Sequence, residues 1–195
     1  MLNESAQTVL RRLELLVPEL AASDNSHIAE LLAEMIAGRC LPHAVIIESG
    51  DPAVGGRLAR VLARAHLCGC DSPLGGECRA CHLFETYDSH PDMYVIEGSG
   101  ASGAISVKSV REAKGRGGII PTDASGTVYL LEHGELMQKP AQNALLKMFE
   151  EPPEGLMLIM TCSTRMKLLE TIRSRGTIYL ENFSPASSPS TTKAV

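Results

Sequence analysis

The sequence predicts an α/β protein whose parallel sheet is covered by helices on both faces. Four short apolar runs have the length of buried strands, and each is bounded by Gly, Pro or charged residues. They span residues 44–47, 93–96, 127–131 and 156–161. Segments with helical spacing of apolar residues lie between them. The 195 residues include 44% hydrophobic and 21% charged residues, a balance typical of a globular protein with its own core.

Two amphipathic helices are expected before the first strand. Leu10, Leu13 and Val17 recur at helical spacing in the first of them. The second carries Ile28, Leu31, Leu32, Met35 and Ile36. Asn25 or Ser26 is a suitable N-cap for the second helix, and Gly38 stands where a helix ends. We therefore expect residues 1–40 to form a helical lead that packs on a body of residues 41–183.

A Gly/Pro-rich loop over residues 49–56 is expected after the first strand and before a helix. This order is the setting of a phosphate-binding loop with the template G-x-x-x-x-G-K-[ST]. Gly50 and Gly55 fit the two glycine positions, whereas Gly56 and Arg57 stand where the lysine and the hydroxyl residue belong. The lysine neutralises phosphate charge and the hydroxyl binds Mg²⁺. The sequence thus predicts a degenerate phosphate loop, with an ordinary glycine turn as the alternative.

ATP binding and hydrolysis by this chain are disfavoured for the same reason. An active hydrolase would also place acidic residues after a strand, to hold a metal ion and position water. Here Glu132 and then His133 follow the run 127–131. Glu132 could bind a metal, although a solvated carboxylate is the simpler interpretation. Arg57 in place of the missing lysine is the remaining route to ATP binding.

Four of the six cysteines, Cys68, Cys70, Cys78 and Cys81, fall within a 14-residue segment. Zinc binds four thiolates tetrahedrally, and a two-residue spacing lets one turn supply two of them. The segment 68–81 therefore predicts a structural zinc module. Four thiolates leave no open coordination position, which disfavours a catalytic zinc. The alternatives are free or buried thiols.

Two further sets of residues bear on this module. Histidines that flank it could replace one of its cysteines as a ligand; they are His66, His82 and His90. Cys40 and Cys162 lie far from the cluster in sequence and are expected in the core.

Helical patterns continue over residues 107–114 and 141–149. Lys108 and Arg111, together with Lys114 and Arg116, form a local basic stretch on the first of these helices. Lys108 and Arg111 would share a face and could contact phosphates. The alternative is a solvated helix face.

Composition excludes several classes of protein. The net charge of −5 disfavours a basic protein that coats DNA. No apolar run is long enough to span a membrane, and the N-terminal residues lack the apolar segment of a signal peptide. Clustered cysteines suggest a reducing compartment, so a cytoplasmic location is expected. Residues 184–195 are mostly Ser, Thr, Pro and Ala, and we expect a disordered tail.

Five segments together resemble bacterial DNA polymerase III clamp-loader subunits of the delta-prime type. Leu41-Pro42-His43-Ala44 precedes the first strand and His90-Pro91-Asp92 the second, as in that family. The residues Ile-Ser-Val-Lys-Ser-Val-Arg-Glu at 105–112 resemble I-x-V-D-x-I-R-E. Residues 141–153, AQNALLKMFEEPP, are close to A-x-N-A-L-L-K-x-L-E-E-P-P. Residues 169–176, LETIRSRG, resemble L-x-x-T-I-R-S-R-C. The resemblance covers residues 41–183.

The resemblance implies an AAA+ module of the P-loop type with an inserted zinc module, in a subunit that lacks working nucleotide chemistry of its own. It carries over Arg175, with Ser174 beside it, as an arginine finger that acts on the ATP of a neighbouring subunit. A guanidinium at the γ-phosphate stabilises charge in the transition state. Without the resemblance, Arg175 would be interpreted as a surface arginine at a helix end.

The implied partners are the ATPase and other subunits of the loader, the sliding clamp, and primer–template DNA held by the assembly. The implied task is to help load the clamp onto primed DNA within the polymerase III holoenzyme. Two rival functions remain: an ATP-binding, motor-type loader subunit, and a zinc-stabilised nucleic-acid-binding module. With seven aromatic residues and no Trp, base-stacking platforms are not evident.

The sequence also departs from the family pattern. Gly176 replaces the cysteine of S-R-C, and Lys108 stands where the family often has Asp. The first cysteine of the family's zinc trio falls at Gly75, and Cys70 is the candidate to replace it. Family members continue into a helical lid and a collar. We therefore expect either a truncated chain or a shortened relative.

Overall fold

A five-stranded, wholly parallel sheet forms the centre of the molecule in a computed structural model. The model describes residues 2–21, 25–96, 98, 103–116, 121–122, 126–174 and 179–180. The strand order is β2-β3-β4-β1-β5. The strands are β1 (Ala44–Glu48), β2 (Met93–Ile96), β3 (Thr127–Leu131), β4 (Leu156–Cys162) and β5 (Tyr179–Leu180). Each neighbouring pair runs parallel. The predicted α/β class is confirmed, and the first four strands lie where the apolar runs placed them.

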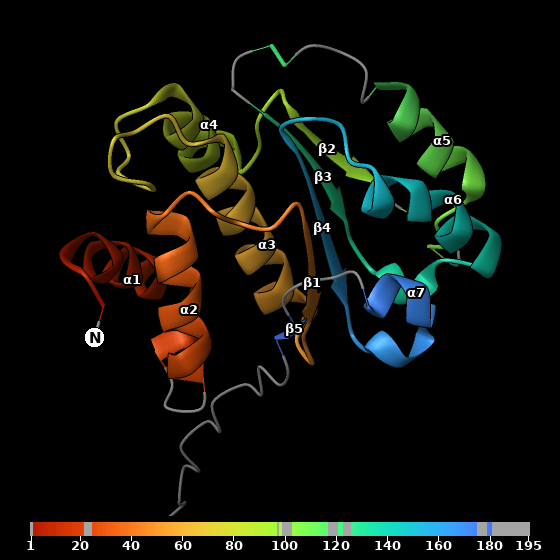
Figure 1. Ribbon diagram of the computed structural model, residues 1–195, viewed down its shortest axis with the longest axis horizontal. Helices are drawn as coiled ribbons and strands as arrows, with labels where there is room; N and C mark the ends of the chain where they lie inside the picture. The colour runs from red at the N-terminus through yellow and green to blue at the C-terminus, as the bar shows by residue number, and fades with distance from the viewer. Residues whose placement is uncertain are drawn as a thin grey trace, which may run out of the picture.

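Helices cover both faces of this sheet (Figure 1). On one face lie α1 (Glu4–Leu16), η1 (Pro18–Ala21), α2 (Ser26–Ala37), α3 (Pro52–Leu67) and α4 (Arg79–Tyr87). The other face carries α5 (Val107–Arg116), α6 (Lys139–Glu150) and α7 (Glu170–Arg173). Two short 3₁₀ turns, η3 (Gly134–Leu136) and η4 (Arg165–Lys167), follow β3 and β4.

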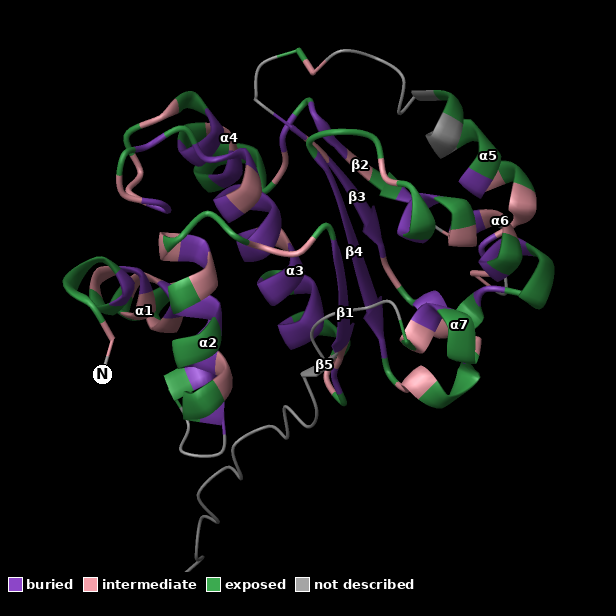
Figure 2. Cartoon of the chain, viewed as in Figure 1, coloured by how far each residue is buried: buried purple, intermediate pink, exposed green. Residues whose placement is uncertain are grey.

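Alternation along each strand divides the buried side chains between two cores. Val45 and Ile47 of β1 point into the core beneath α3, whereas Ala44 and Ile46 point into the core beneath α6. Successive side chains of a strand face opposite sides, so a sheet covered on both faces needs apolar residues at every position. Figure 2 accordingly shows the central strands as buried along most of their length.

The N-terminal helices share the first of these cores. Val9 and Leu13 of α1, Leu20 of η1 and Leu32 of α2 belong to the same buried cluster as Leu58 of α3. Asn3 caps α1 by accepting a 2.8 Å hydrogen bond from the backbone N–H of Ala6. The apolar stripe expected in the lead is thus continuous with the packing of the body.

Two sequence-based expectations are wrong in detail. The predicted loop over 49–56 is shorter, because α3 already begins at Pro52 behind the N-cap Asp51. Proline suits the first helical position, where its missing N–H costs nothing. Cys40, expected in the core, is exposed, whereas Cys162 is buried as expected. In addition, α4, α7 and β5 were not predicted as separate elements.

The carboxyl ends of the parallel strands gather at one edge of the sheet. The segment 49–51, η3 and η4 all leave the sheet there, since they follow β1, β3 and β4 directly. In open parallel sheets, ligand sites form beyond this edge. Among the described residues, no helix is both long and apolar enough to cross a membrane.

Replacing Ile46 by Ala tests the packing of the central strand. Ile46 is fully buried, so Ile46→Ala should lower the free energy of unfolding by about 2–5 kcal/mol, measured by urea denaturation. Leu15 on α1 is 81% exposed, and Leu15→Ala should change the free energy of unfolding by less than about 0.5 kcal/mol. Equal effects of the two changes would contradict the placement of β1.

Candidate functional site

The start of α3 is capped by its own aspartate. Asp51 Oδ1 accepts a 2.8 Å hydrogen bond from the N–H of Ala53, and the carbonyl of Asp51 accepts one of 3.1 Å from Gly55. Pro52 has no N–H. A helix N-terminus binds phosphate through backbone N–H groups in its first turn that have no other partner. Three of the first four helical positions therefore offer no donor to an anion, and the Asp51 carboxylate would repel one.

The glycines of the predicted phosphate loop lie around this cap. Gly50 is exposed in the turn before Asp51. Gly55 and Gly56 are buried inside the first turns of α3 and do not form a loop. A Cβ built on Gly55 would lie 3.2 Å from Cβ of Ser49, so close packing of α3 against the β1 turn favours glycine at that position.

Arg57 is paired with an acidic side chain of the N-terminal lead. Its Nη2 forms an ion pair with Oε1 of Glu19 in η1. The pair joins the N-terminal lead to the first turns of α3. Arg57, which the sequence suggested as a replacement for the missing lysine, is therefore already paired with a carboxylate.

Arg60 occupies the space beside Gly56, where the template has its lysine. Its Nη1 lies 2.7 Å from Oε1 of Glu132, and its Nε lies 3.0 Å from Oδ2 of Asp88. A Cβ on Gly56 would lie 3.3 Å from Nη1 of Arg60 and 3.7 Å from Oε1 of Glu132. Glu132 and Arg60 each expose a quarter of their side chain. The strand-end carboxylate considered as a metal ligand is thus neutralised by a guanidinium.

Other polar groups at this edge also pair with one another. Glu48, at the end of β1, accepts a 2.9 Å hydrogen bond from the N–H of Arg165 and lies 3.5 Å from its Nε. Glu135 accepts hydrogen bonds from both the N–H and the hydroxyl of Ser163. These contacts bind the turns after β1, β3 and β4 into one network.

Gln142 on α6 connects this edge to α7. It is 2% exposed. Its Nε2 donates to the carbonyls of Met137 and Lys167, and its Oε1 accepts a 2.7 Å bond from the N–H of Leu169. All three of these hydrogen bonds are made with backbone groups. Gln142 therefore fixes the chain that leads into α7, a role that the sequence analysis missed although the residue lies in its most specific motif.

Ser174, predicted beside the arginine finger, ends α7 and is exposed. Its N–H donates to the carbonyl of Glu170 at 2.9 Å, and its hydroxyl donates to the carbonyl of Thr171 at 3.2 Å. Arg175 lies outside the described residues. Gln142 therefore anchors the start of α7, and Ser174 lies at the opposite end of this helix.

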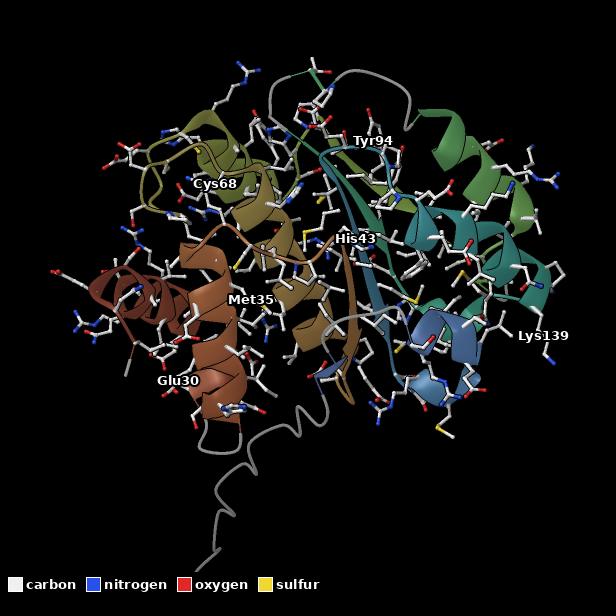
Figure 3. All side chains as sticks on the ribbon, viewed as in Figure 1. Glu30, Met35, His43, Cys68, Tyr94 and Lys139 are labelled. Atoms are coloured by element: carbon white, nitrogen blue, oxygen red, sulfur yellow. The ribbon has the colours of Figure 1, made fainter. Side chains whose placement is uncertain are left out.

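The four predicted ligand cysteines form one cluster between α3 and α4. Their sulfur atoms all lie within 4.8 Å of one another. Cys68 is 3.7 Å from Cys81, Cys78 is 3.9 Å from Cys68, and Cys70 is 4.0 Å from Cys81, in each case between Sγ atoms. Figure 3 marks Cys68 at the end of α3, beside α4.

These distances fit a tetrahedral metal ion. Four thiolates at about 2.3 Å from zinc would lie about 3.8 Å from one another. The hydrogen bond with Cys81 lowers the pKa of Cys68, while the bond with Cys68, together with burial, raises the pKa of Cys81 to about 12. Cys81 therefore keeps a proton in the metal-free cluster, which a bound cation would displace.

The fourth sulfur atom of the cluster belongs to Cys70 and not to position 75. A Cβ built on Gly75 would lie 2.9 Å from the carbonyl oxygen of Ser72, so a cysteine there would force the turn to shift. The flanking histidines contribute nothing to the cluster: His66 contacts the carbonyl of Gly155 at 3.0 Å, and His90 accepts from the N–H of Asp92. His82 is exposed.

The cluster lies at the far end of α3 from the Asp51 cap. Sixteen helical residues span about 24 Å, so a metal ion held by these cysteines is remote from the carboxyl edge of the sheet. Four thiolates also exclude a substrate from the coordination sphere. The arrangement suits a structural metal.

Lys108 and Arg111 are exposed on α5, as the basic-face hypothesis requires. Lys108 is 85% exposed and lies 3.7 Å from Oε1 of Glu112, one helical turn further on. An exposed pair of this kind contributes little to stability. The side chains of Lys114 and Arg116 lie outside the described residues.

The chain is similar to subunits of DNA polymerase III. Residues 24–184 match the model of the family described as "DNA polymerase III, delta subunit". Subunit delta' of Pseudomonas aeruginosa is 35% identical over 151 residues, which are 75% of this chain and 45% of the relative. Subunit delta' of Escherichia coli is 31% identical over 158 residues, or 77% and 45% of the two chains. Subunit gamma/tau of Mycobacterium tuberculosis is 30% identical and is covered over 26% of its length.

Among solved structures, a DNA polymerase III gamma subunit-related protein from Thermotoga maritima has the same fold. The TM-score is 0.58 at 20% sequence identity, over 78% of this chain and 45% of that one. The chain spans less than half the length of these relatives.

The Asp51 cap can be tested without reference to any ligand. Asp51→Ala removes the acceptor of the Ala53 N–H and should lower the free energy of unfolding by about 1 kcal/mol in urea titrations. Asp51→Ser keeps a good capping group and should stay within a few tenths of a kcal/mol of the parent. Equal loss in both variants would argue against capping.

Proposed function

We propose that this chain, which belongs to the family described as DNA polymerase III, delta subunit, is a non-hydrolysing AAA+ subunit of a bacterial clamp loader. It matches delta' relatives over less than half of their length. It helps load the sliding clamp onto primed DNA and presents Arg175 to the ATP of a neighbouring subunit. Its partners are the loader's ATPase subunits, the clamp and primer–template DNA, in the bacterial cytoplasm.

One observation carries this proposal: at the carboxyl edge of the sheet, where a nucleotide would bind, the polar groups pair with the chain's own side chains. Asp51 caps α3, Arg57 pairs with Glu19, and Arg60 pairs with Glu132. Each contact occupies a donor, a cation or a carboxylate that would otherwise be available to Mg·ATP. A subunit of this kind affects ATP hydrolysis only through a residue that it presents to the ATP of a neighbouring subunit.

Geometry around α7 supports the arginine-finger role. Gln142 holds the backbone at Lys167 and Leu169, and the intact α7 ends at Ser174, immediately before Arg175. A finger must be positioned accurately, because misplacement of a charged group sharply reduces transition-state stabilisation. Anchoring of the start of α7 by Gln142 is the feature that supports this role.

The cysteine cluster holds a structural zinc ion in this proposal. Cys68, Cys70, Cys78 and Cys81 supply the ligands, and Arg64, 6% exposed, donates from Nε to Sγ of Cys81 at 3.3 Å. The guanidinium offsets part of the negative charge of four thiolates. Zinc would cross-link the α3–α4 connection, which contains few apolar residues of its own. Lys108 and Arg111 are the proposed phosphate contacts for DNA within the assembly.

Isothermal titration calorimetry with Mg·ATP tests whether this chain binds the nucleotide. We expect no binding heat from this chain at millimolar ATP, because the phosphate site lacks a lysine and contains a carboxylate. Arg57→Ala serves as the matched variant. Tight binding that disappears in Arg57→Ala would show that Arg57 replaces the lysine, and the motor-type alternative would then hold.

Arg175→Ala in a reconstituted loader tests the finger. ATP turnover at the adjoining site, measured with clamp and primed DNA, should fall by about a hundredfold, as when one transition-state donor is removed. Arg175→Lys keeps the charge but loses the planar fork, so little activity should return. Unchanged turnover in a correctly assembled loader would refute the assignment.

Metal analysis of the purified chain should find about one zinc per chain. Cys81→Ser should abolish stoichiometric zinc, because it removes the ligand that contacts both Cys68 and Cys70. Cys40 is exposed and is not part of the cluster, so Cys40→Ser should retain the full zinc content. Fully reduced thiols with no bound zinc in the parent chain would contradict the proposed centre.

A further inference from the structure

Helix α1 precedes the residues 24–184 that match the family model, so the family relationship assigns it no role. The helix is nevertheless well packed. Ala6, Val9 and Leu13 are buried, and the latter two belong to the core shared with α2 and α3. Figure 1 shows α1 beside α2, on the side of the sheet that carries the cysteine segment between α3 and α4.

Arg12 of α1 reaches the middle of that cysteine segment. Its Nη1 donates to the hydroxyl of Ser72 at 2.7 Å, to the carbonyl of Pro73 at 2.8 Å and to the carbonyl of Ser72 at 3.3 Å. Ser72 and Pro73 form part of the bend between Cys70 and Cys78. One nitrogen of α1 thus holds the bend that brings the two cysteine pairs together.

Arg39, just after α2, binds the start of the same segment. Its Nη1 donates to the carbonyl of Cys68 at 2.9 Å, and its Nη2 donates to the carbonyl of Cys70. Together with Arg64 at Cys81, three arginines from three parts of the chain surround the thiolate cluster. Groups just outside a metal's ligands orient those ligands and typically change metal affinity when they are removed.

We propose that α1 is a clasp for the metal module, with Arg12 as its positioning residue. This inference rests on the proposed zinc site. Release of the metal requires the four sulfur atoms to separate, and hence the bend at Ser72 to move relative to Cys68. Arg12 opposes that movement by tying the bend to a helix that packs one face on the main core. By linkage, a bound metal also stabilises the docking of α1.

Zinc release from the loaded 195-residue chain tests the clasp. Transfer of zinc to an excess of a chromophoric chelator should be about tenfold faster in Arg12→Ala than in the parent, the size expected for an outer contact of a metal site. Arg11 is exposed on the same helix, and Arg11→Ala should release zinc within twofold of the parent rate. Arg12→Lys should restore most of the slow release, because a single nitrogen makes all three bonds.

Amide hydrogen exchange gives a second readout, independent of release rates. Chelation of zinc should accelerate exchange in residues 4–16 of the parent chain, and much less in β1, which lies in the centre of the sheet. Exchange in residues 4–16 that does not respond to zinc would overturn the linkage. This measurement uses the parent chain, so it stands even where Arg12→Ala fails to fold.

The two proposals fail in different ways. A parent chain that binds no zinc refutes the metal centre, and the clasp falls with it. A parent chain that binds one zinc, while Arg12→Ala releases it at the parent rate, refutes the clasp alone. Loss of slow release in Arg11→Ala as well as Arg12→Ala would assign the effect to general destabilisation of α1 and would also refute the role of Arg12.

Discussion

The packing of α3 against the centre of the sheet is the constraint on which the other features depend. The helix contacts β1, β3 and β4 on one side and α1 and α4 on the other. Leu58 and Leu62 are fully buried between these layers. Because α3 is held along its whole length, its start is fixed at the carboxyl edge of the sheet and its end at the cysteine cluster. One helix therefore places both candidate sites.

Charge pairing explains how this edge is stable without a ligand. An unpaired carboxylate such as Glu132, three-quarters buried, would be costly, and Arg60 neutralises it at 2.7 Å. The same contact removes the groups with which a metal or a phosphate would interact. The pairing that stabilises this edge thus also accounts for the proposed lack of nucleotide chemistry, and the proposed contribution of the chain moves to the segment that begins at the exposed Ser174.

Much of the fold was predictable because a parallel sheet buried on both faces leaves continuous apolar runs. β2 and β3 agree with their predicted bounds. Short helices were harder to predict: α7 has four residues, and α4 begins among the clustered cysteines, whose spacing indicates a site and not a helix. The exposure of Cys40 was missed because cysteine is usually buried, and only the turn after α2 places it outside.

Residue types at short separations were sufficient to indicate the cysteine cluster, because metal binding needs particular side chains close together in the chain. Pairings between residues far apart in the chain could not be predicted from such spacing. Arg57 meets Glu19 across 38 residues, Arg12 meets Ser72 across 60, and Arg60 meets Glu132 across 72. These contacts depend on how helices and sheet pack in three dimensions, where one arginine among many equivalent ones comes within reach of a particular acceptor.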